Sequence, residues 1–210
     1  IDCDLGDDVR VTHIGSHLTH YTVGAGAVVT DVGVMATHPG ATFGNGVEVA
    51  AANEGGGREM RIFNEMSSQF AYLVCMHRYR PDMIKRLEAM VDACVAGVTS
   101  DRGRIGEGAV VAHVAEIVDV NIGPYAVVSG ASRLKNGAVL SERDAPTRVG
   151  AGVVAEDFII GEGSSVEGSA LLNKVFVGQG VEIGKQFSAE NSLFFANSEC
   201  FHGEACSVFG

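Results

Sequence analysis

The amino-acid sequence places an aliphatic residue at every sixth position over much of its length. In the segment RIGEGAVVAHVAEIVDVNIGPYAVVSGASRL, residues 104–134, the step is six residues except for one step of five, and the repeated positions are Ile105, Val111, Ile117, Ile122, Val128 and Leu134. This period matches neither the helical 3.6 nor the two-residue alternation of a plain strand. It fits a short strand and a turn that together form one side of a coil. Three such sides return the chain to its starting point after about 18 residues.

Matched positions one coil apart recur elsewhere in the chain, with a slip of one position at some corners. Leu5 and Val23, each followed by glycine, are separated by three full repeats, and the pattern resumes at Phe43-Gly44 and Val49. Further matched positions are Ile105, Ile122 and Leu140, then Ile160, Val177 and Phe195, with Ile183 and Phe201 one side further on. The sequence therefore predicts a parallel β-helix, in which aliphatic ladders fill the interior. A β-sandwich is the alternative, but its strands would be less regularly spaced.

The motifs VGAGAVV, IGEGAVV, IGPYAVV, IGEGSSV and VGQGVEIG resemble those of hexapeptide-repeat proteins. This resemblance covers residues 1–54 and 104–210 and implies a three-sided, left-handed parallel β-helix that assembles into homotrimers. The combination of NEGGGRE, a helical insert and FFANSECFHGEACSVFG is similar to an uncharacterised bacterial hexapeptide-repeat family with longer members. We therefore expect this chain to be part of a longer protein.

The six-residue period is absent between residues 55 and 97. Apolar residues there follow spacings of three and four, which predict an amphipathic helix from Met60 to His77 and a second one from Pro81 to Cys94. The expected division is β-helix coils at 1–54, a helical hairpin insert at 55–99 and coils at 100–210. The hairpin would cover a coil edge, pack between subunits or wall a substrate cleft.

Composition narrows the classes of partner. The formal net charge is −11, with 15 Lys and Arg against 26 Asp and Glu, and no basic cluster of the kind that binds nucleic acid is present. No apolar run is long enough to span a membrane. Five cysteines without a CxxC pair or a secretion signal indicate reduced thiols in a cytoplasm. We expect small molecules and further copies of the chain as partners.

The resemblance implies acyl transfer from an acyl-CoA or acyl carrier protein thioester to a sugar or sugar nucleotide. In that chemistry one histidine removes a proton from the acceptor hydroxyl or amine, and imidazole is suited to this role near neutral pH. A non-catalytic β-helix that organises a longer protein, as in sugar-nucleotidyltransferases, is the second hypothesis. The fold alone does not choose between them.

The last predicted coils contain the first candidate site. His202 follows Phe201, which is expected to face inward, so His202 should face outward and act as the base. Glu204 and Glu199 are near enough in sequence to orient its ring. The expected hydroxyl-binding residues are Asn191 and Asn197, together with Glu199. Equally, asparagines often occupy β-helix turns, and His202 would then be a solvated surface residue.

A second candidate site lies at the start of the insert, in NEGGGREMRIF. Glycines that lead into a helix N-terminus can bind an anion through backbone N–H groups and the helix dipole. Asn53, Gly56 and Arg58 would surround such an anion. No GK[ST] follows, so this is not a P-loop. The alternative is a flexible hinge.

The remaining histidines and cysteines support weaker hypotheses. His113 is a second candidate base, and His38, beside Pro39, is interpreted as a turn residue. The trio His13, His17 and His20 suggests zinc, but His17 is counted on the inward ladder and the others on different faces, so no metal is expected. Cys200 and Cys206 are interpreted as small apolar fillers rather than nucleophiles.

Overall fold

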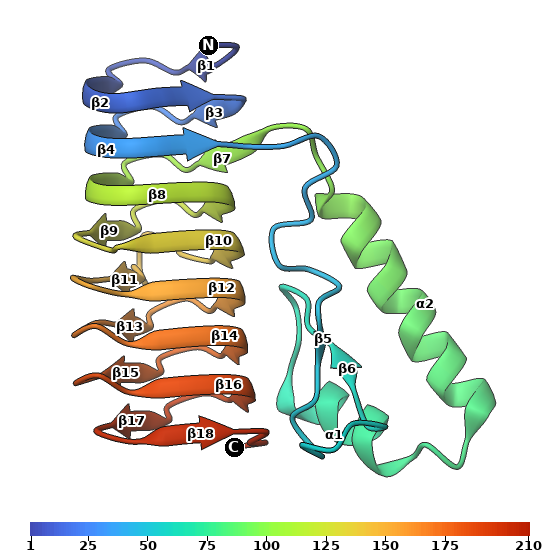
Figure 1. Cartoon of the computed structure of the whole chain (residues 1–210). Helices are drawn as coiled ribbons and strands as arrows, with labels where there is room; N and C mark the ends of the chain where they lie inside the picture. Colours follow the sequence, from blue (N-terminus) through green and yellow to red (C-terminus); the bar gives the residue numbers. More distant parts are fainter.

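The computed structural model describes residues 1–210 and shows a mainly β chain with two helices inserted in mid-chain. Sixteen strands form one sheet, in which all recorded strand pairs are parallel. The sheet curls into a β-helix-like stack of coils with the two termini at opposite ends (Figure 1). The predicted parallel, mainly β architecture with a helical insertion is confirmed. Neither helix combines the length and the hydrophobicity that a membrane span requires.

The strands before the helices are β1 (Asp4–Leu5), β2 (Arg10–Thr19), β3 (Tyr21–Val23), β4 (Val28–Ala36), β5 (Glu48–Val49) and β6 (Met60–Arg61). The helices are α1 (Ser68–Met76) and α2 (Pro81–Val98). The next strands are β7 (Gly103–Ile105), β8 (Val110–Ile122), β9 (Val127–Ser129), β10 (Arg133–Val139), β11 (Arg148–Val149) and β12 (Val154–Ile160). The last are β13 (Ser165–Val166), β14 (Leu171–Val177), β15 (Glu182–Gly184), β16 (Ser188–Phe194), β17 (Glu199–Phe201) and β18 (Glu204–Cys206).

Strand register reproduces the repeat read from the sequence. Val110 pairs with Val127 and Arg148 with Ser165, so each of these coils is one position shorter than three full hexapeptides. Between β9 and β11, where Val127 pairs with Arg148, the coil is longer, because it contains a short loop with an isolated bridge between Glu142 and Ala145. Each coil therefore hydrogen-bonds to its neighbours along the stack.

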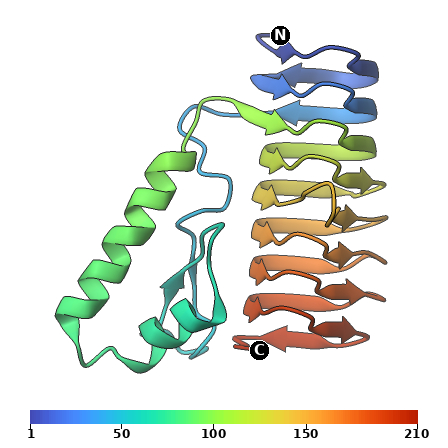
Figure 2. The same ribbon diagram turned by 180° about the vertical axis from the view of Figure 1, so that it is seen from behind.

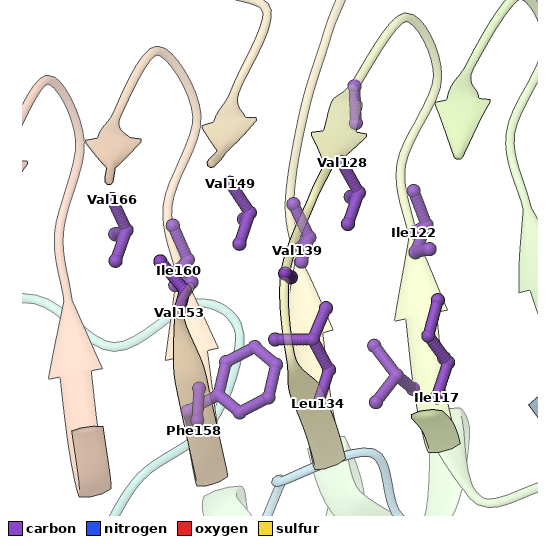
Figure 3. Close-up of a cluster of buried hydrophobic side chains, with 14 of the residues drawn as sticks. Ile117, Ile122, Val128, Leu134, Val139, Val149, Val153, Phe158, Ile160 and Val166 are labelled. Carbon is purple, nitrogen blue, oxygen red and sulfur yellow. The ribbon is translucent and has the colours of Figure 1, made fainter. Parts of the chain in front are cut away.

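The aliphatic ladder forms an axial core of 34 buried residues inside the coils. All six positions of the ladder in residues 104–134 are at most 1% exposed. Figure 3 shows side chains such as Ile117, Leu134 and Phe158 pointing into this core from neighbouring strands. Phe158 fills the space beside Gly137, where a β-carbon would lie 2.3 Å from its ring. The Phe158 ring thus takes the space of the side chain that Gly137 lacks.

The backbone turns of the coils use left-handed residues at recurring positions. Asp119, Asn136, Asp157, Lys174 and Asn191 all have positive φ and follow one another along one edge of the stack. A second edge carries positive-φ residues that include His13, Asp31 and His113, and His202 has positive φ at a turn of the last coils. Asn, Asp and His tolerate this conformation better than other non-glycine residues, because their short polar side chains bond locally.

The insertion leaves the sheet at Ala36, earlier than residue 55, and rejoins it at Gly103. Tyr21 of β3 therefore pairs with Gly103 as its next neighbour. We call residues 37–102 the insert. It stands beside the coils in both views, with α2 on its outer side (Figures 1 and 2). Phe43-Gly44 and Val49 imitate the coil period but lie in the insert, so their assignment to a coil is wrong.

The first predicted helix is much shorter than expected. Met60 and Arg61 form β6, which pairs antiparallel with β5, and α1 begins only at Ser68. Ser67 caps α1 by accepting a hydrogen bond from the Phe70 N–H at 3.2 Å. The predicted second helix is confirmed as α2, which starts at Pro81.

The insert packs on the outer surface of the sheet through a second apolar cluster, which we call the insert core. Four of its members, Ala138, Ile159, Phe176 and Leu193, come from the outward side of β10, β12, β14 and β16. The members from the insert are Val49, Ala51, Met60, Ile62, Phe63, Met66, Ala71, Val74 and Val91. The C-terminal parts of the strands that contribute to the insert core are thus buried on both faces.

Several predicted inward positions are displaced by one position. Ile122 pairs with Val139, not Leu140, and Val177 pairs with Phe194, not Phe195. Ile183 pairs with Cys200, so Cys200 rather than Phe201 packs against the axial core. The sequence count assumed three full hexapeptides where these coils are one position shorter. A register shift between Ile14 and His17 likewise leaves His17 exposed rather than inward.

Candidate functional site

Polar side chains on the edge of the stack beside the insert hold the part of the insert that precedes α1 against the coils. Asn136 Oδ1 accepts a hydrogen bond from the Gly44 N–H at 2.9 Å, and its Nδ2 donates to Asp157 at 2.7 Å. Asn191 Oδ1 accepts from the Ala50 N–H at 3.4 Å. This edge therefore gives the insert a defined position on the sheet.

The best oriented acid–base pair lies at the start of this segment. His38 Nδ1 is 3.0 Å from Asp119 Oδ2 and 3.2 Å from Oδ1, and the His38 backbone N–H donates to Oδ1 at 2.6 Å. An ionised carboxylate only accepts, so in the neutral ring this contact favours the tautomer with the proton on Nδ1, which leaves the lone pair on Nε2. The Asp119 side chain is 19% exposed and that of His38 is 69% exposed. The ring is therefore oriented by a half-buried carboxylate and open to a substrate.

A second His–Asp cluster lies on another edge of the stack. Asp31 lies 3.1 Å from His13 Nδ1 through Oδ1 and 3.4 Å from His113 Nδ1 through Oδ2. The two imidazoles are 76% and 66% exposed. Both therefore lie on the open surface, and neither borders the clefts beside the insert.

Two clefts separate the insert from the sheet. The first, of about 490 Å³, lies between the start of α1 and the ends of β12, β14 and β16; its lining includes Ser67, Glu162, Phe176, Gln179 and Phe195. The second, of about 470 Å³, lies between the end of α2 and β7, β8 and β10; its lining includes Ser100, Arg102, Arg104 and Asn121. Asn64 and Leu140 line both clefts, so the two clefts are adjacent.

His38 lies next to the wall of the second cleft. The Gly40 N–H donates to Asp101 Oδ1 at 2.8 Å, and Ala41 forms an antiparallel bridge with Ser100, a lining residue. Asp119 is two positions before Asn121, which lines the same cleft. The oriented imidazole and the cleft thus belong to one region of the molecule.

The residues predicted in the last coils are not brought together. His202 has positive φ and is exposed, with no hydrogen bond or ion pair to Glu199 or Glu204 recorded. Asn197 has positive φ on a different turn, where its backbone N–H donates to Gln179 at 3.0 Å. Spacings of five or six positions place such side chains on successive sides of a coil.

Asn191 and the two carboxylates also have structural positions. Asn191 bonds the insert, as described above, and Glu199 and Glu204 are exposed residues of β17 and β18. Burial raises the pKa of the Cys200 thiol, which disfavours a thiolate nucleophile. Cys200 is partly buried against the axial core, which fits an apolar filler, but Cys206 is exposed, so that interpretation is wrong for Cys206.

The predicted anion site at the glycines has no helix behind it, since β6 rather than a helix follows. The loop bonds to itself: Asn53 Oδ1 accepts from the Gly55 N–H, Asn53 Nδ2 donates to the Gly56 carbonyl, and Glu59 accepts from the Gly57 N–H at 2.7 Å. That last bond is the main cause of the lowered pKa of Glu59. Glu59 thus already occupies a backbone N–H group that the predicted anion would have used, and Arg58 is exposed beside the loop.

The histidine trio considered for zinc is dispersed. His13 contacts Asp31, His17 Nδ1 lies 2.9 Å from Ser16 Oγ, and His20 lies 3.5 Å from Asp2. No group of three or more His, Cys, Asp or Glu residues in the chain is arranged to hold a metal ion.

The sequence reading interpreted His38 only as a turn residue and did not single out Asp119. The two residues are 81 positions apart, on either side of the insert. The register of Ala36 with Val118 places Thr37 opposite Asp119, so a count that carried this offset across the insert would have placed His38 one position from that carboxylate. That count requires the bounds of the insert, which local patterns did not supply.

Comparison with known proteins provides a family but no activity. A family model described as "Domain of unknown function (DUF4954)" matches residues 1–210. An uncharacterized protein of Treponema pallidum (strain Nichols) is 30% identical over 177 residues, which cover 79% of this chain and 24% of the relative. The chain thus spans about a quarter of that relative's length. No solved structure matches.

Proposed function

Because this chain belongs to the DUF4954 family, whose function is unknown, we propose its activity from the geometry of the site. We propose that it is a left-handed, three-sided parallel β-helix of hexapeptide repeats that carries out acyl transfer. The left hand is supported by Figure 1, where the nearer strands point to the right as the chain descends. The donor would be an acyl-CoA or acyl carrier protein thioester, and the acceptor a sugar or sugar nucleotide.

The oriented His38–Asp119 pair is the observation that carries this proposal. His38 Nε2 takes the proton of the acceptor hydroxyl, and the acceptor oxygen attacks the thioester carbonyl carbon. The tetrahedral intermediate collapses with cleavage of the C–S bond, and the imidazolium returns its proton to the departing thiolate. Asp119 holds the ring in the required tautomer and stabilises the imidazolium. Products are an ester and a free thiol.

Self-association as a homotrimer and a cytoplasmic location are parts of the same proposal. The resemblance to hexapeptide-repeat proteins supports the trimer, since their donor thioester lies in a groove between subunits. The absence of any disulfide among the five cysteines is in keeping with a reducing compartment.

A non-catalytic scaffold is the second candidate function. It is favoured by the structural use of polar edge residues: Asp119 accepts from the His38 backbone, while Asn136 and Asn191 bond the insert. Under this alternative, Asp119 serves the insert and His38 has no chemical role.

Removal of the base separates the two functions. In the full-length protein, His38→Ala is expected to lower the rate of thiol release from acyl-CoA, measured with a panel of sugar and sugar-nucleotide acceptors, by about 10²- to 10⁴-fold. Asp119→Asn should lower kcat by a comparable factor, because an asparagine no longer selects the His38 tautomer that has its proton on Nδ1.

His202→Ala is the matched control, since His202 is also an exposed histidine at a positive-φ turn. It is expected to keep wild-type turnover. Loss of turnover in His202→Ala with full activity in His38→Ala would move the base to the last coils, as the sequence predicted. A folded protein without turnover for any acyl-CoA would support the scaffold.

A further inference from the structure

The turn between α1 and α2 carries a local surplus of positive charge in an acidic chain. Residues 72–86, which we call the tip, contain four of the 15 Lys and Arg residues but only one of the 26 Asp and Glu residues. The four cations, Arg78, Arg80, Lys85 and Arg86, are all exposed, and the ion pairs that Lys and Arg form in this chain lie elsewhere. This surplus was not singled out from the sequence, because the chain as a whole is acidic.

The tip also exposes an apolar face of α1. Tyr72, Leu73 and Met76 lie at helical spacings of three and four, on the side of α1 opposite Ala71 and Val74. Ala71 and Val74 are buried in the insert core, whereas Tyr72 and Met76 are 53% and 56% exposed. This short helix therefore has apolar residues on two sides, and the structure covers only one of them.

Aromatic rings connect the apolar face to the cations. The His77 ring lies 5.8 Å from the ring of Tyr72 and 5.8 Å from the ring of Tyr79. The Arg80 guanidinium lies 5.5 Å from the centre of the Tyr79 ring, within the range of a cation–π contact. Tyr79 itself is 70% exposed. The tip thus presents rings and positive charge as one ordered surface.

The tip projects from the molecule and is fastened to the insert. In both views the turn between the helices lies at the outer corner of the insert, away from the coils (Figures 1 and 2). Arg78 donates a hydrogen bond to the Gly57 carbonyl at 2.9 Å and a second one to the Glu59 carbonyl. A projection of this kind can approach a broad surface, whereas a folded protein partner would need a groove of complementary shape.

An anionic lipid surface matches both parts of the tip. Negatively charged headgroups attract exposed Lys and Arg side chains within a Debye length. Tyrosine rings lie well at the headgroup level, and the apolar area that they bury adds to this attraction. A single-stranded nucleic acid would also attract the cations, but its bases stack on free ring faces. Tyr79 already contacts Arg80 and His77, so lipid is the better match.

We propose that the tip binds a membrane surface that contains anionic lipids. The exposed apolar side chains of α1 and the ring of Tyr79 enter the headgroup region, while Arg80, Lys85 and Arg86 bind lipid phosphates. The acidic remainder of the chain is repelled by such a surface, so the chain approaches it with the tip first. This interaction goes beyond the proposed function and does not depend on His38.

Co-sedimentation of the full-length protein with vesicles tests the charge of the tip. Vesicles of phosphatidylcholine with about 30% phosphatidylserine should bind it, and vesicles of phosphatidylcholine alone should bind it much more weakly. Each basic residue near such a surface strengthens binding about fivefold, so the combined variant Arg80→Gln, Lys85→Gln, Arg86→Gln should bind roughly 100-fold more weakly. Added salt should weaken wild-type binding.

A matched variant removes the same charge from the coils. Arg10, Arg104 and Arg148 are exposed arginines of β2, β7 and β11 that form no ion pair in this chain. Their combined replacement by glutamine should leave vesicle binding unchanged. This control separates a specific role of the tip from a general effect of net charge.

The apolar part of the tip has its own test. Tyr79→Ser is expected to weaken vesicle binding about fivefold, because one interfacial ring is lost. Leu171→Ser, which alters a β14 residue that is 49% exposed, should have no effect. Both side chains are largely outside the core, so both variants should keep the fold.

Equal vesicle binding by wild type and the combined tip variant would overturn the proposal. So would equal binding to vesicles with and without phosphatidylserine. Saturable binding of a single-stranded oligonucleotide without any vesicle binding would also overturn it, and would assign the tip to nucleic acid. Acyl transfer is measured separately, and His38→Ala should bind vesicles as wild type does.

Discussion

Replacement of Phe158 by alanine is expected to lower the free energy of unfolding by about 3–5 kcal/mol. Phe158 is fully buried in the axial core, and its ring lies where a side chain at Gly137 would otherwise be. Because Gly137 has no side chain, the neighbouring coil cannot fill the cavity by a rotamer change. Chemical denaturation of the full-length protein, followed by circular dichroism, measures the loss.

Phe209→Ala is the matched control, because it removes the same ring from a phenylalanine that is 40% exposed. It should lower the free energy of unfolding by much less. In a stacked architecture each coil contacts mainly its neighbours, so hydrogen exchange in Phe158→Ala should rise first in β10, β12 and β14. Equal losses for the two variants would show that the axial core relaxes around the missing ring.

Gly44→Ala is expected to detach the insert from the coils while leaving the coils folded. Gly44 has φ of +80°, and a β-carbon there would lie 2.4 Å from the Phe158 carbonyl oxygen, a backbone atom. The left-handed conformation alone costs an alanine about 1–2 kcal/mol, and the clash adds roughly 1–3 kcal/mol. The bond from the Gly44 N–H to Asn136 would also be strained.

Hydrogen exchange measures this separation, with faster exchange expected in α1, α2 and β6 than in the coil strands. Gly40→Ala is a close control: Gly40 has φ of +75°, but nothing lies within 4 Å of its β-carbon position. It should show only the conformational cost. If Gly40→Ala and Gly44→Ala loosened the insert equally, the close approach at Phe158 would not be what positions it.

The candidate site was only partly predictable from the sequence. Histidine, aspartate and asparagine occur at the turns for a backbone reason, namely their tolerance of positive φ, so their presence in repeats did not distinguish catalytic residues. His202 and Asn197 illustrate this, since each occupies a left-handed turn on a different side of the coil. His38 and Asp119 meet only because the insert leaves and re-enters the sheet between them.

The position of the insert left a signal in the sequence that the repeat obscured. Triplets such as Phe158-Ile159-Ile160 and Val175-Phe176-Val177 are apolar on both faces of a strand, which indicates burial on both sides. They show that something covers these strands. They do not show what covers them, because the same pattern suits a helix, another subunit or a further sheet.

The sequence by itself determined the stacked parallel coils and their interior ladder. A strand alternates its side chains with a period of two, so an aliphatic residue every sixth position returns to the same inward face on each side of a coil. Only the tertiary structure decided the exact register, the bounds of the insert and the pairing of His38 with Asp119. Those depend on coils that are shorter or longer than three full hexapeptides and on contacts across the insert, which no local pattern encodes.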